Sequence, residues 1–354
     1  MLQTETASTG LAKYIPIAGW LPRYQPAWLR FDLIAGLTAA AVVIPQAMAY
    51  AAIAGLPVQV GLYTALVPML IYVLLGTSRP LSVSSTSTIS MLSATELARV
   101  AQGGDPADYL VAASTLALLV GVFLLLAGLL RLGFLANFIS LPVLTGFKAG
   151  IGLVIFVGQL GKVLGLSAKK GPVLQTILQI VENLDQIHLL TLALSLITLV
   201  ILIFLPRLTK RLPAPLVAVA VGILASVLLG LGGLGVKLVG DIPAGLPAFS
   251  PPDLSLMSAL WPGALGIALM SFVESIASAR AFAKHDDPPV QADQELLALG
   301  AANVGGSFFQ AYPAGGGTSQ TAVNDQAGAR SQLAEAVTAG VVAVTLLFLA
   351  PLCL

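Results

Sequence analysis

The sequence has few charged residues. Only 9% of its 354 residues are Asp, Glu, Lys or Arg, against about 25% in an average soluble domain. The mean hydropathy is +0.94, and 57% of the residues are hydrophobic. So little polar surface cannot cover a water-soluble globule, and it also excludes a disordered chain and a coiled coil. The composition therefore predicts an all-α polytopic membrane protein.

Cysteine and histidine are almost absent as well. The single cysteine, Cys353, excludes an internal disulfide and a thiolate metal site, and His188 and His285 are too few for a histidine metal cluster. No catalytic triad or metalloprotease motif occurs, so we expect no enzyme, no metal and no cofactor. A net charge of +1 offers nothing to nucleic acid. The polar start, Met1–Gly10, does not resemble a cleaved signal peptide.

Long apolar runs predict eleven membrane elements. The 57 glycines and prolines (35 and 22) further predict that some helices break within the membrane. The elements are the two halves of Leu33–Ser78, divided at Gly55-Leu56-Pro57, then Ser84–Thr95, Tyr109–Leu130, Phe138–Gly161, Leu189–Leu205, Pro215–Leu231, Trp261–Ala283, Leu296–Phe309, Thr318–Ala329 and Gln332–Ala350. Tyr14–Tyr24 and Val173–Leu184 are expected to lie in the interface between membrane and water. If every element crosses the membrane, eleven Lys and Arg residues lie on the same side of the membrane as the N-terminus and five lie on the opposite side. Because the cytoplasmic side carries the excess of Lys and Arg, this count favours a cytoplasmic N-terminus.

Two of these elements are too short to span, and each follows a polar or glycine-rich stretch. The stretches are Ser84–Thr88 and Gly315–Ser319, and their elements lie seven apart in order, as an inverted seven-plus-seven repeat requires. Half-helices whose N-termini meet near the midplane place free N–H groups and positive dipole ends together, and this attracts an anion. The alternative is that both pieces are hairpin loops outside the membrane.

Glu274 lies within the otherwise apolar span Trp261–Ala283. An ionised side chain there costs about 2.5–3.5 kcal/mol on insertion scales, so burial favours the protonated form. A carboxyl group of this kind can bind and release a proton as its exposure alternates. The alternative is a structural, protonated carboxyl that donates one hydrogen bond.

Other polar residues are candidates for contact with an anion. Gln46 and Tyr50 follow the mid-span Pro45 and share one helix face. The two half-helices offer hydroxyl groups, an amide and close backbone approach; the candidates are Thr86, Ser87 and Thr88 at one, and Gly317, Thr318, Ser319 and Gln320 at the other. Each of these residues could equally serve as packing or capping between helices.

The remaining charges within or beside spans have simpler interpretations. Lys148 is expected to snorkel from a span end, and Asp32, Glu96 and Arg99 to lie at span edges. Asp325 and Glu335, near the last two elements, are candidates for structural partners there, and Asp286-Asp287 for a solvated loop.

Three stretches together resemble the sulfate permease family (SulP, solute carrier 26). The first is Pro45-Gln46-Ala47-Met48-Ala49-Tyr50-Ala51 with Gly61-Leu62-Tyr63 and Gly76-Thr77-Ser78-Arg79. The second is Glu274-Ser275-Ile276-Ala277 with Asp293-Gln294-Glu295-Leu296 and Asn303; the third is Pro313–Asn324 with Ala327-Gly328-Ala329-Arg330. They run in order over about residues 28–335, which is most of the chain.

The resemblance implies fourteen membrane segments in two inverted repeats, with half-helices 3 and 10 and with core and gate domains. It implies an anion between the N-termini of segments three and ten, beside segments one and eight, and an elevator movement of the core against the gate. It also implies a homodimer in the lipid bilayer. The first repeat would be residues 30–253 and the incomplete second repeat 254–354, after a lead-in of residues 1–29.

The resemblance also assigns roles residue by residue. Gln46 and Tyr50 fall on the family's segment-one site positions, Thr86 on the segment-three position, and Ser319 and Gln320 on the segment-ten positions. Glu274 matches the acidic residue that is linked with proton coupling in bacterial and plant members.

Three features depart from the family pattern. Ser84-Ser85 replaces the usual Gly-Pro before segment three, and Gln320 stands where many animal exchangers have arginine. Less fixed positive charge favours proton–anion symport over anion exchange. The chain ends at Leu354, so we interpret it as lacking three segments and the cytoplasmic regulatory STAS domain.

We therefore predict a secondary active transporter of small anions (sulfate, bicarbonate or a dicarboxylate such as fumarate) in a bacterial-like inner membrane, with H⁺ as the coupling ion. A nucleobase–proton symporter of the same architecture is one alternative, since Glu274 and Gln320 could grip a base. A passive anion channel is the other.

Overall fold

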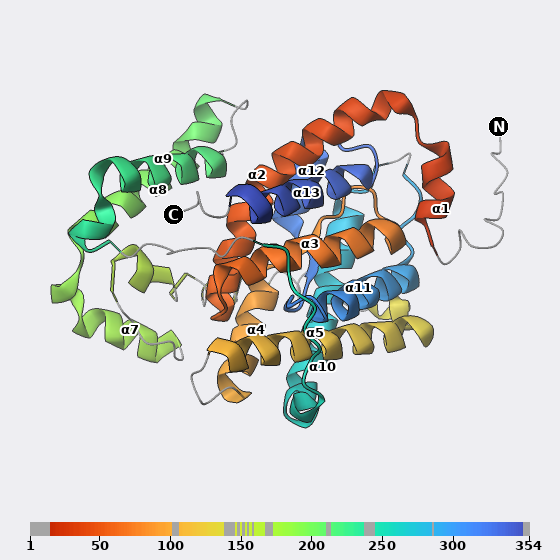
Figure 1. The fold of residues 1–354 in the computed structure, drawn as a ribbon, viewed down its shortest axis with the longest axis horizontal. Coiled ribbons are helices and arrows are strands. Elements are labelled where there is room, and N and C mark those ends of the chain that lie inside the picture. The colour runs from red at the N-terminus through yellow and green to blue at the C-terminus, as the bar shows by residue number, and fades with distance from the viewer. Residues whose placement is uncertain are drawn as a thin grey trace. The chain divides into compact units, whose positions relative to one another are not determined.

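The structure is a computed structural model, which describes residues 15–100, 106–137, 146, 149–150, 153, 156–157, 159–166, 173–209, 214–236, 245–284 and 287–349. The chain divides into two compact units (Figure 1). Unit 1 comprises residues 1–138 and 244–349, and unit 2 comprises residues 139–243 and 350–354. Both half-helices lie in unit 1, so this unit corresponds to the core of the predicted fold and unit 2 to part of the gate.

Unit 1 is a bundle of helices around two very short strands. Its helices are α1 (Ile17–Trp20), α2 (Leu29–Ala54), α3 (Val58–Leu75), α4 (Ser87–Val100), α5 (Pro106–Leu129), α10 (Met257–Ala281), α11 (Ala292–Ser307), α12 (Thr318–Gln326) and α13 (Leu333–Val344). Short 3₁₀ turns cover Leu21–Arg23, Pro26–Trp28, Leu132–Asn137 and Leu254–Leu256, and a π turn, Thr345–Leu349, follows α13. Helices α2, α3 and α13 pack on one another, and α11 packs between α3 and α5 (Figure 1).

The predicted division of the first long apolar run is confirmed at Gly55. This residue ends α2 with a φ of 82°, a left-handed conformation that glycine adopts without strain. Pro57 then precedes α3, whose first turn does not need its missing N–H. Two separate helices result, both long and apolar enough to span a membrane.

Helices α4 and α12 are both too short to span. At 14 and 9 residues they reach about 21 and 14 Å, less than the roughly 30 Å of a bilayer's hydrocarbon layer. Each follows one strand, β1 (Val83–Ser84) before α4 and β2 (Gly315–Gly316) before α12. The two strands pair antiparallel, with Val83 opposite Gly316 and Ser84 opposite Gly315.

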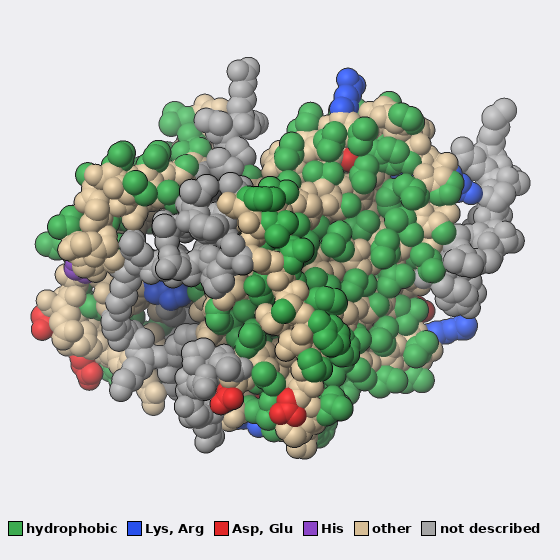
Figure 2. All heavy atoms as spheres, in the orientation of Figure 1, with side chains coloured by type: hydrophobic (Ala, Val, Ile, Leu, Met, Phe, Trp, Pro, Cys, Tyr) green, Lys and Arg blue, Asp and Glu red, His purple; other side chains and the backbone are tan. Residues whose placement is uncertain are grey.

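Unit 2 contains α7 (Val173–Glu182), α8 (Leu189–Leu208) and α9 (Ala214–Leu229), with 3₁₀ turns at Leu184–Gln186 and Leu231–Leu234. Helix α8 is one of five described helices that could cross a membrane, and none of its most apolar stretch is buried within the protein. Such a surface requires lipid or another protein rather than water. On the face drawn in Figure 2, hydrophobic side chains likewise cover most of the described surface.

Some predicted boundaries differ from the observed ones for a physical reason. We expected Glu96 and Arg99 to stop the third element, but α4 continues to Val100 because Arg99 pairs with Glu96 at 2.8 Å and also donates to the Ala259 carbonyl. The ninth element begins at Ala292, before Glu295, because that carboxylate is bonded by protein groups. The predicted span Phe138–Gly161, with Lys148, lies largely outside the described residues.

Candidate anion site

Pairing of β1 with β2 brings the N-termini of α4 and α12 together, as the sequence pattern predicts. Glycine allows this close approach. A Cβ atom on Gly316 would lie 2.9 Å from the Cα of Ser275 on α10, so the strand could not lie there with a side chain. The Gly316 N–H donates to Ser275 Oγ at 2.6 Å, and Gly317 N donates to the Ser82 carbonyl at 3.0 Å.

Glu274 lies on α10 at the N-terminus of α4. Thr86 Oγ1 donates to its Oε2 at 3.0 Å, and Thr88 Oγ1 donates to its Oε1 at 2.6 Å. Thr86 also caps α4, because the Ile89 N–H donates to its Oγ1 at 3.3 Å. The Glu274 side chain is only 6% exposed. A carboxylate at this position is stabilised by the helix dipole and two hydroxyl donors.

Tyr50 connects this group to the second half-helix. Its hydroxyl is within hydrogen-bonding reach of Ser319 on α12 and of Ser87 on α4, and it interacts electrostatically with Glu274. The predicted site residues Tyr50, Thr86, Ser87, Thr88, Glu274 and Ser319 thus form one cluster, to which α2, α4, α10 and α12 contribute. Gln46 lies one turn before Tyr50 on α2, and its Oε1 is buried without a partner among the described residues.

The three remaining predicted residues at the start of α12 are placed differently. Gln320 is buried, and its Oε1 accepts from Ser84 Oγ at 2.7 Å while its Nε2 donates to the Ser85 carbonyl at 3.4 Å. Thr318 shares a hydrogen bond of 2.7 Å with Ser278 on α10. Gly317 is buried, whereas Thr318 and Ser319 are exposed. Ser319 is therefore the hydroxyl of this half-helix that is open to a ligand.

Side chains to which the sequence analysis gave no role hold the broken backbone in place; of these, Asn303 appeared there only as part of a family stretch. The Asn303 amide pairs with Ala314, accepting from its N–H at 2.8 Å and donating to its carbonyl at 3.1 Å. Ser271 Oγ donates to the same carbonyl at 2.8 Å. Tyr312, which is fully buried, shares a hydrogen bond of 2.8 Å with Ser90 of α4. The position of Tyr312, three residues before the first glycine of the break, is the sequence signal that could have indicated it.

Glu295 is a second buried carboxylate, and it holds the loop after α3. It accepts from Thr77 N at 2.7 Å, from Thr77 Oγ1 at 2.6 Å and from Tyr72 Oη at 2.9 Å. All of its described partners are structural groups away from Glu274. The family stretch that contains Glu295 therefore supports the fold around the site.

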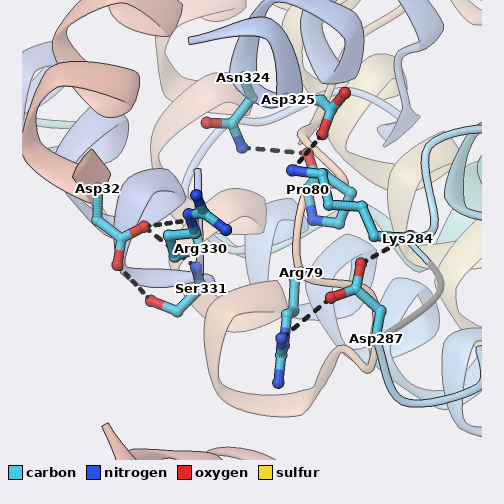
Figure 3. Close-up of polar contacts among 9 residues, drawn as sticks. All are labelled: Asp32, Arg79, Pro80, Lys284, Asp287, Asn324, Asp325, Arg330 and Ser331. Carbon is cyan, nitrogen blue, oxygen red and sulfur yellow. Dashed lines mark hydrogen bonds and ion pairs between the residues drawn. The ribbon is translucent and has the colours of Figure 1, made fainter. Parts of the chain in front are cut away.

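Charged residues gather where the loop after α3 meets the ends of α10 and α12 (Figure 3). Arg79 pairs with Asp287 at 3.0 Å, and Lys284 pairs with Asp325 at 2.8 Å, so Asp325 has the expected structural partner. Asp287 was expected only in a solvated loop. Its side chain is 11% exposed, because the partner Arg79 holds it against the protein.

Asp32 differs from the expected span-edge residue. It is fully buried in the first turn of α2, and its carboxylate accepts from the N–H groups of Arg330 and Ser331 at 2.7 and 3.1 Å and from Ser331 Oγ at 2.7 Å (Figure 3). These donors satisfy a charge that burial would otherwise make costly. Tyr24 adds a hydroxyl donor at 3.1 Å. His285, Asp286 and Cys353 lie outside the described residues.

Within the described ranges, no group of three or more His, Cys, Asp or Glu residues could hold a metal ion. The polar atoms that the site offers are hydroxyls, a carboxyl, an amide oxygen and helix N-termini. Interrupted helices whose ends meet inside a membrane bundle define the class of inverted-repeat secondary transporters.

Comparison with known proteins identifies the family within that class. The profile of the sulfate permease family matches residues 29–354, and the chain belongs to this family. A probable sulfate transporter of Mycobacterium tuberculosis is 40% identical over 339 residues, which cover 94% of this chain and 60% of that protein. Human solute carrier family 26 member 6 is 34% identical over 352 residues, 93% of this chain and 46% of its own length.

Solved structures show the same fold. The murine solute carrier 26 family member A9, in an inward-facing state, superposes with a TM-score of 0.90 at 26% identity, covering 98% of this chain and 62% of that one. The transmembrane domain of the cyanobacterial bicarbonate transporter BicA gives 0.84 at 27% identity, covering 93% and 85%. The fold is thus the solute carrier 26 membrane domain, and the family consists of transporters rather than enzymes, as predicted. The chain spans 60% of the mycobacterial relative and less of the human one.

Proposed function

We propose that this chain forms the substrate-binding part of a proton-coupled anion symporter. The observation that carries the proposal is the position of Glu274, whose carboxyl accepts hydroxyl donors from Thr86 and Thr88 at the start of α4. This place, a helix N-terminus with two hydroxyl groups, is also one that an incoming anion would favour. Cargo and carboxylate therefore compete for the same donors.

A proton resolves the competition. Two negative charges close together in a membrane interior repel strongly, so an anion binds more readily when Glu274 is neutral. Protonation also removes the negative charge that Thr86 and Thr88 stabilise, and their hydroxyls become available to the cargo. Proton and anion then bind together and are released together, which is the thermodynamic requirement for symport.

The cargo that fits this chemistry is a small oxyanion or carboxylate: sulfate, bicarbonate or a dicarboxylate such as fumarate. Gln320 is a neutral amide, so charge is balanced by the two helix dipoles and by the proton on Glu274. We further propose an elevator movement of the core against the gate, a homodimer, and insertion in a bacterial plasma membrane with the N-terminus in the cytoplasm. The excess of Lys and Arg on that side supports this orientation.

The nucleobase alternative has weaker support than the anion. It requires Gln320 and Glu274 to grip one base, but the Gln320 amide is bonded to Ser84 and Ser85. The passive channel requires a continuous polar path. The described contacts form a local cluster at the half-helix ends instead.

Uptake by the purified full-length protein in liposomes tests the proposal. Labelled sulfate, bicarbonate, fumarate and uracil are compared with and without an inward proton gradient. We expect one of the anions to be accumulated, the gradient to stimulate its uptake several-fold, and Glu274→Gln to abolish that stimulation. Glu182→Gln on the exposed face of α7 is the matched control and should behave as wild type. Gradient-driven uptake that persists in Glu274→Gln, or uptake of uracil alone, contradicts the proposal.

A further inference from the structure

Four side chains, from α12, from α13 and from the residue just before α13, hold the backbone of residues 78–83, which leads into β1 and includes its first residue. Two of these side chains donate to backbone carbonyls: Gln332 Nε2 to Ser78 O at 3.0 Å and Asn324 Nδ2 to Pro80 O at 3.1 Å. The other two accept from backbone N–H groups: Thr321 Oγ1 from Ser82 N at 3.1 Å and Glu335 Oε1 from Val83 N at 2.9 Å. The last of these bonds reaches β1 itself. Glu335 is the only titratable side chain of the four, and the proposed symport does not use it.

The bond to Val83 lies close to the anion site. Val83 pairs with Gly316 of β2, and Thr86, which caps α4 and donates to Glu274, follows three residues later. A shift of Val83 therefore moves Thr86 relative to Glu274. The matching strand is held differently, because the Gly316 N–H donates to the neutral hydroxyl of Ser275.

Glu335 is fully buried, and within the described part of the chain it forms no ion pair with Lys, Arg or His. The charged and titratable residues on the helices packed against α13 are Arg30, Asp32 and Tyr50 on α2 and Tyr63 and Tyr72 on α3. Of these, Tyr72 interacts electrostatically with Glu335 and donates to Glu295, and Asp32 is occupied by Ser331 and Arg330. Asp325 on α12 is paired with Lys284. An ionised Glu335 would thus lack a cation, which is costly when buried.

The uncharged acid fits the neighbouring polar atoms. Glu335 Oε2 and Ser82 Oγ are both buried, neither has another hydrogen-bond partner among the described residues, and the two side chains lie next to each other. A proton on Oε2 can be donated to Ser82 Oγ, while Oε1 continues to accept from Val83. One proton then satisfies both atoms. Because the Ser82 hydroxyl could also donate to an ionised carboxylate, it is the missing cation that favours the neutral acid.

We propose that Glu335 is a positioning residue for the anion site: as an uncharged carboxylic acid, it holds Val83 and thereby sets where Thr86 and the N-terminus of α4 lie. This inference rests on the proposed function, because it assigns Glu335 to the same anion site. It predicts that Glu335 controls anion affinity and not the rate of the transport movement.

Two substitutions separate the roles of shape and hydrogen bonding. Glutamine keeps an oxygen for Val83 and an N–H donor for Ser82, so it mimics the neutral acid, whereas leucine keeps only the size. We expect Glu335→Leu to raise the KM of anion uptake about fivefold to tenfold, the loss of one hydrogen bond, with Vmax within about twofold. Glu335→Gln should keep the wild-type KM.

Thr338→Val is the matched control. Thr338 lies one turn along α13, is also fully buried, and bonds Gly36 O and Ala334 O without touching β1. It should destabilise the fold but leave KM unchanged. Hydrogen–deuterium exchange of the Val83 amide is the second readout, and this amide should exchange faster only in Glu335→Leu.

An unchanged KM and exchange rate in Glu335→Leu overturn the proposal, as does an equal rise of KM in Thr338→Val. A Glu335→Gln protein as impaired as Glu335→Leu shows that the charge is needed, which also contradicts it. If Glu335→Leu does not fold, the glutamine variant still decides, since rescue is predicted for it. If the wild type carries no anion, the proposed function fails while amide exchange still tests the hold on Val83.

Discussion

The two half-helices meet at one point but begin in different ways. Helix α4 follows serines and threonines, and its N-terminus is occupied by the protein's own carboxylate, Glu274. Helix α12 follows three glycines, and its Ser319 hydroxyl is exposed. In the symport proposed above, the α4 end is the proton side, because it carries Glu274, and the α12 end is the cargo side, because its open Ser319 is where the anion enters.

The strands that precede the two half-helices, β1 and β2, are also held in place by different contacts. The β2 backbone lies against α10, where only glycine leaves room beside Ser275. Side chains of α12 and α13 hold β1 and the residue before it. Thr321 accepts from the Ser82 N–H and Glu335 from the Val83 N–H, while Gln320 accepts from the Ser84 hydroxyl. The position of β1 thus depends on side chains that substitution can remove, whereas the position of β2 also depends on close packing that any side chain at Gly316 would disrupt.

Blocking the exposed N-terminal end of α12 should have the largest effect on anion uptake. Ser319→Phe places a ring where α12 opens, so we expect anion uptake in liposomes to fall to background, a loss of about 100-fold or more in Vmax/KM. Ser319→Ala, which removes the hydroxyl without adding bulk, should cost less than about tenfold. Near wild-type affinity in Ser319→Phe would place the cargo elsewhere.

Removing a hydroxyl from the proton side should have a smaller effect. Thr88→Val removes the hydroxyl that bonds Glu274 at 2.6 Å and that, in the proposed mechanism, turns to the anion once Glu274 is protonated. Hydrogen bonds to charged groups contribute about 1.5–3 kcal/mol. We expect KM for the anion to rise about tenfold or more. Thr95→Val, whose hydroxyl bonds only Met91 O on an exposed face of the same helix, should keep the wild-type KM. Equal effects at both positions would remove Thr88 from the site.

The link between the two half-helices should matter more for stability than for transport. Gln320→Leu leaves Ser84 Oγ buried without its acceptor, which costs about 1–3 kcal/mol. We expect a lower melting temperature in detergent and only a few-fold change in KM. Gln326→Leu, at the exposed end of α12, is the control. A large loss of affinity without a change in stability would instead make Gln320 a cargo ligand.

The smallest effect is expected at the charged cluster of Figure 3. Lys284→Gln breaks a partly exposed ion pair with Asp325, and such pairs contribute about 0–1 kcal/mol. Melting temperature and KM should stay close to the wild-type values. A strong loss of uptake here would show that the comparison of the two half-helices omits an essential part of the mechanism.

Much of this architecture can be predicted from the sequence, because membrane spans follow from the length of apolar runs. The two short elements after Ser84–Thr88 and Gly315–Ser319 could be recognised for the same reason. Tyr50, Thr86 and Ser319 were candidates from the polar pattern, with packing as the alternative, and the family resemblance assigned them to the site. The structure brings them together with Glu274. Their roles in transport stay predictions.

What could not be predicted are the bonds between distant segments. Glu335 and Val83 are 252 positions apart, and Glu295 and Tyr72 are 223 apart. No local period reveals which buried polar side chain meets which backbone group. Helix ends were misplaced for the same reason, since α4 passes Glu96 and Arg99 only because these side chains find partners.

The central claim is that one proton on Glu274 accompanies each anion. Anion affinity measured against pH tests it most directly, because uptake of one proton on binding makes Kd fall about tenfold for each unit of decreasing pH while Glu274 is ionised in the free protein. We expect this slope in the wild type and a flat profile in Glu274→Gln. A wild-type Kd independent of pH, or an unchanged slope in Glu274→Gln, would contradict the account.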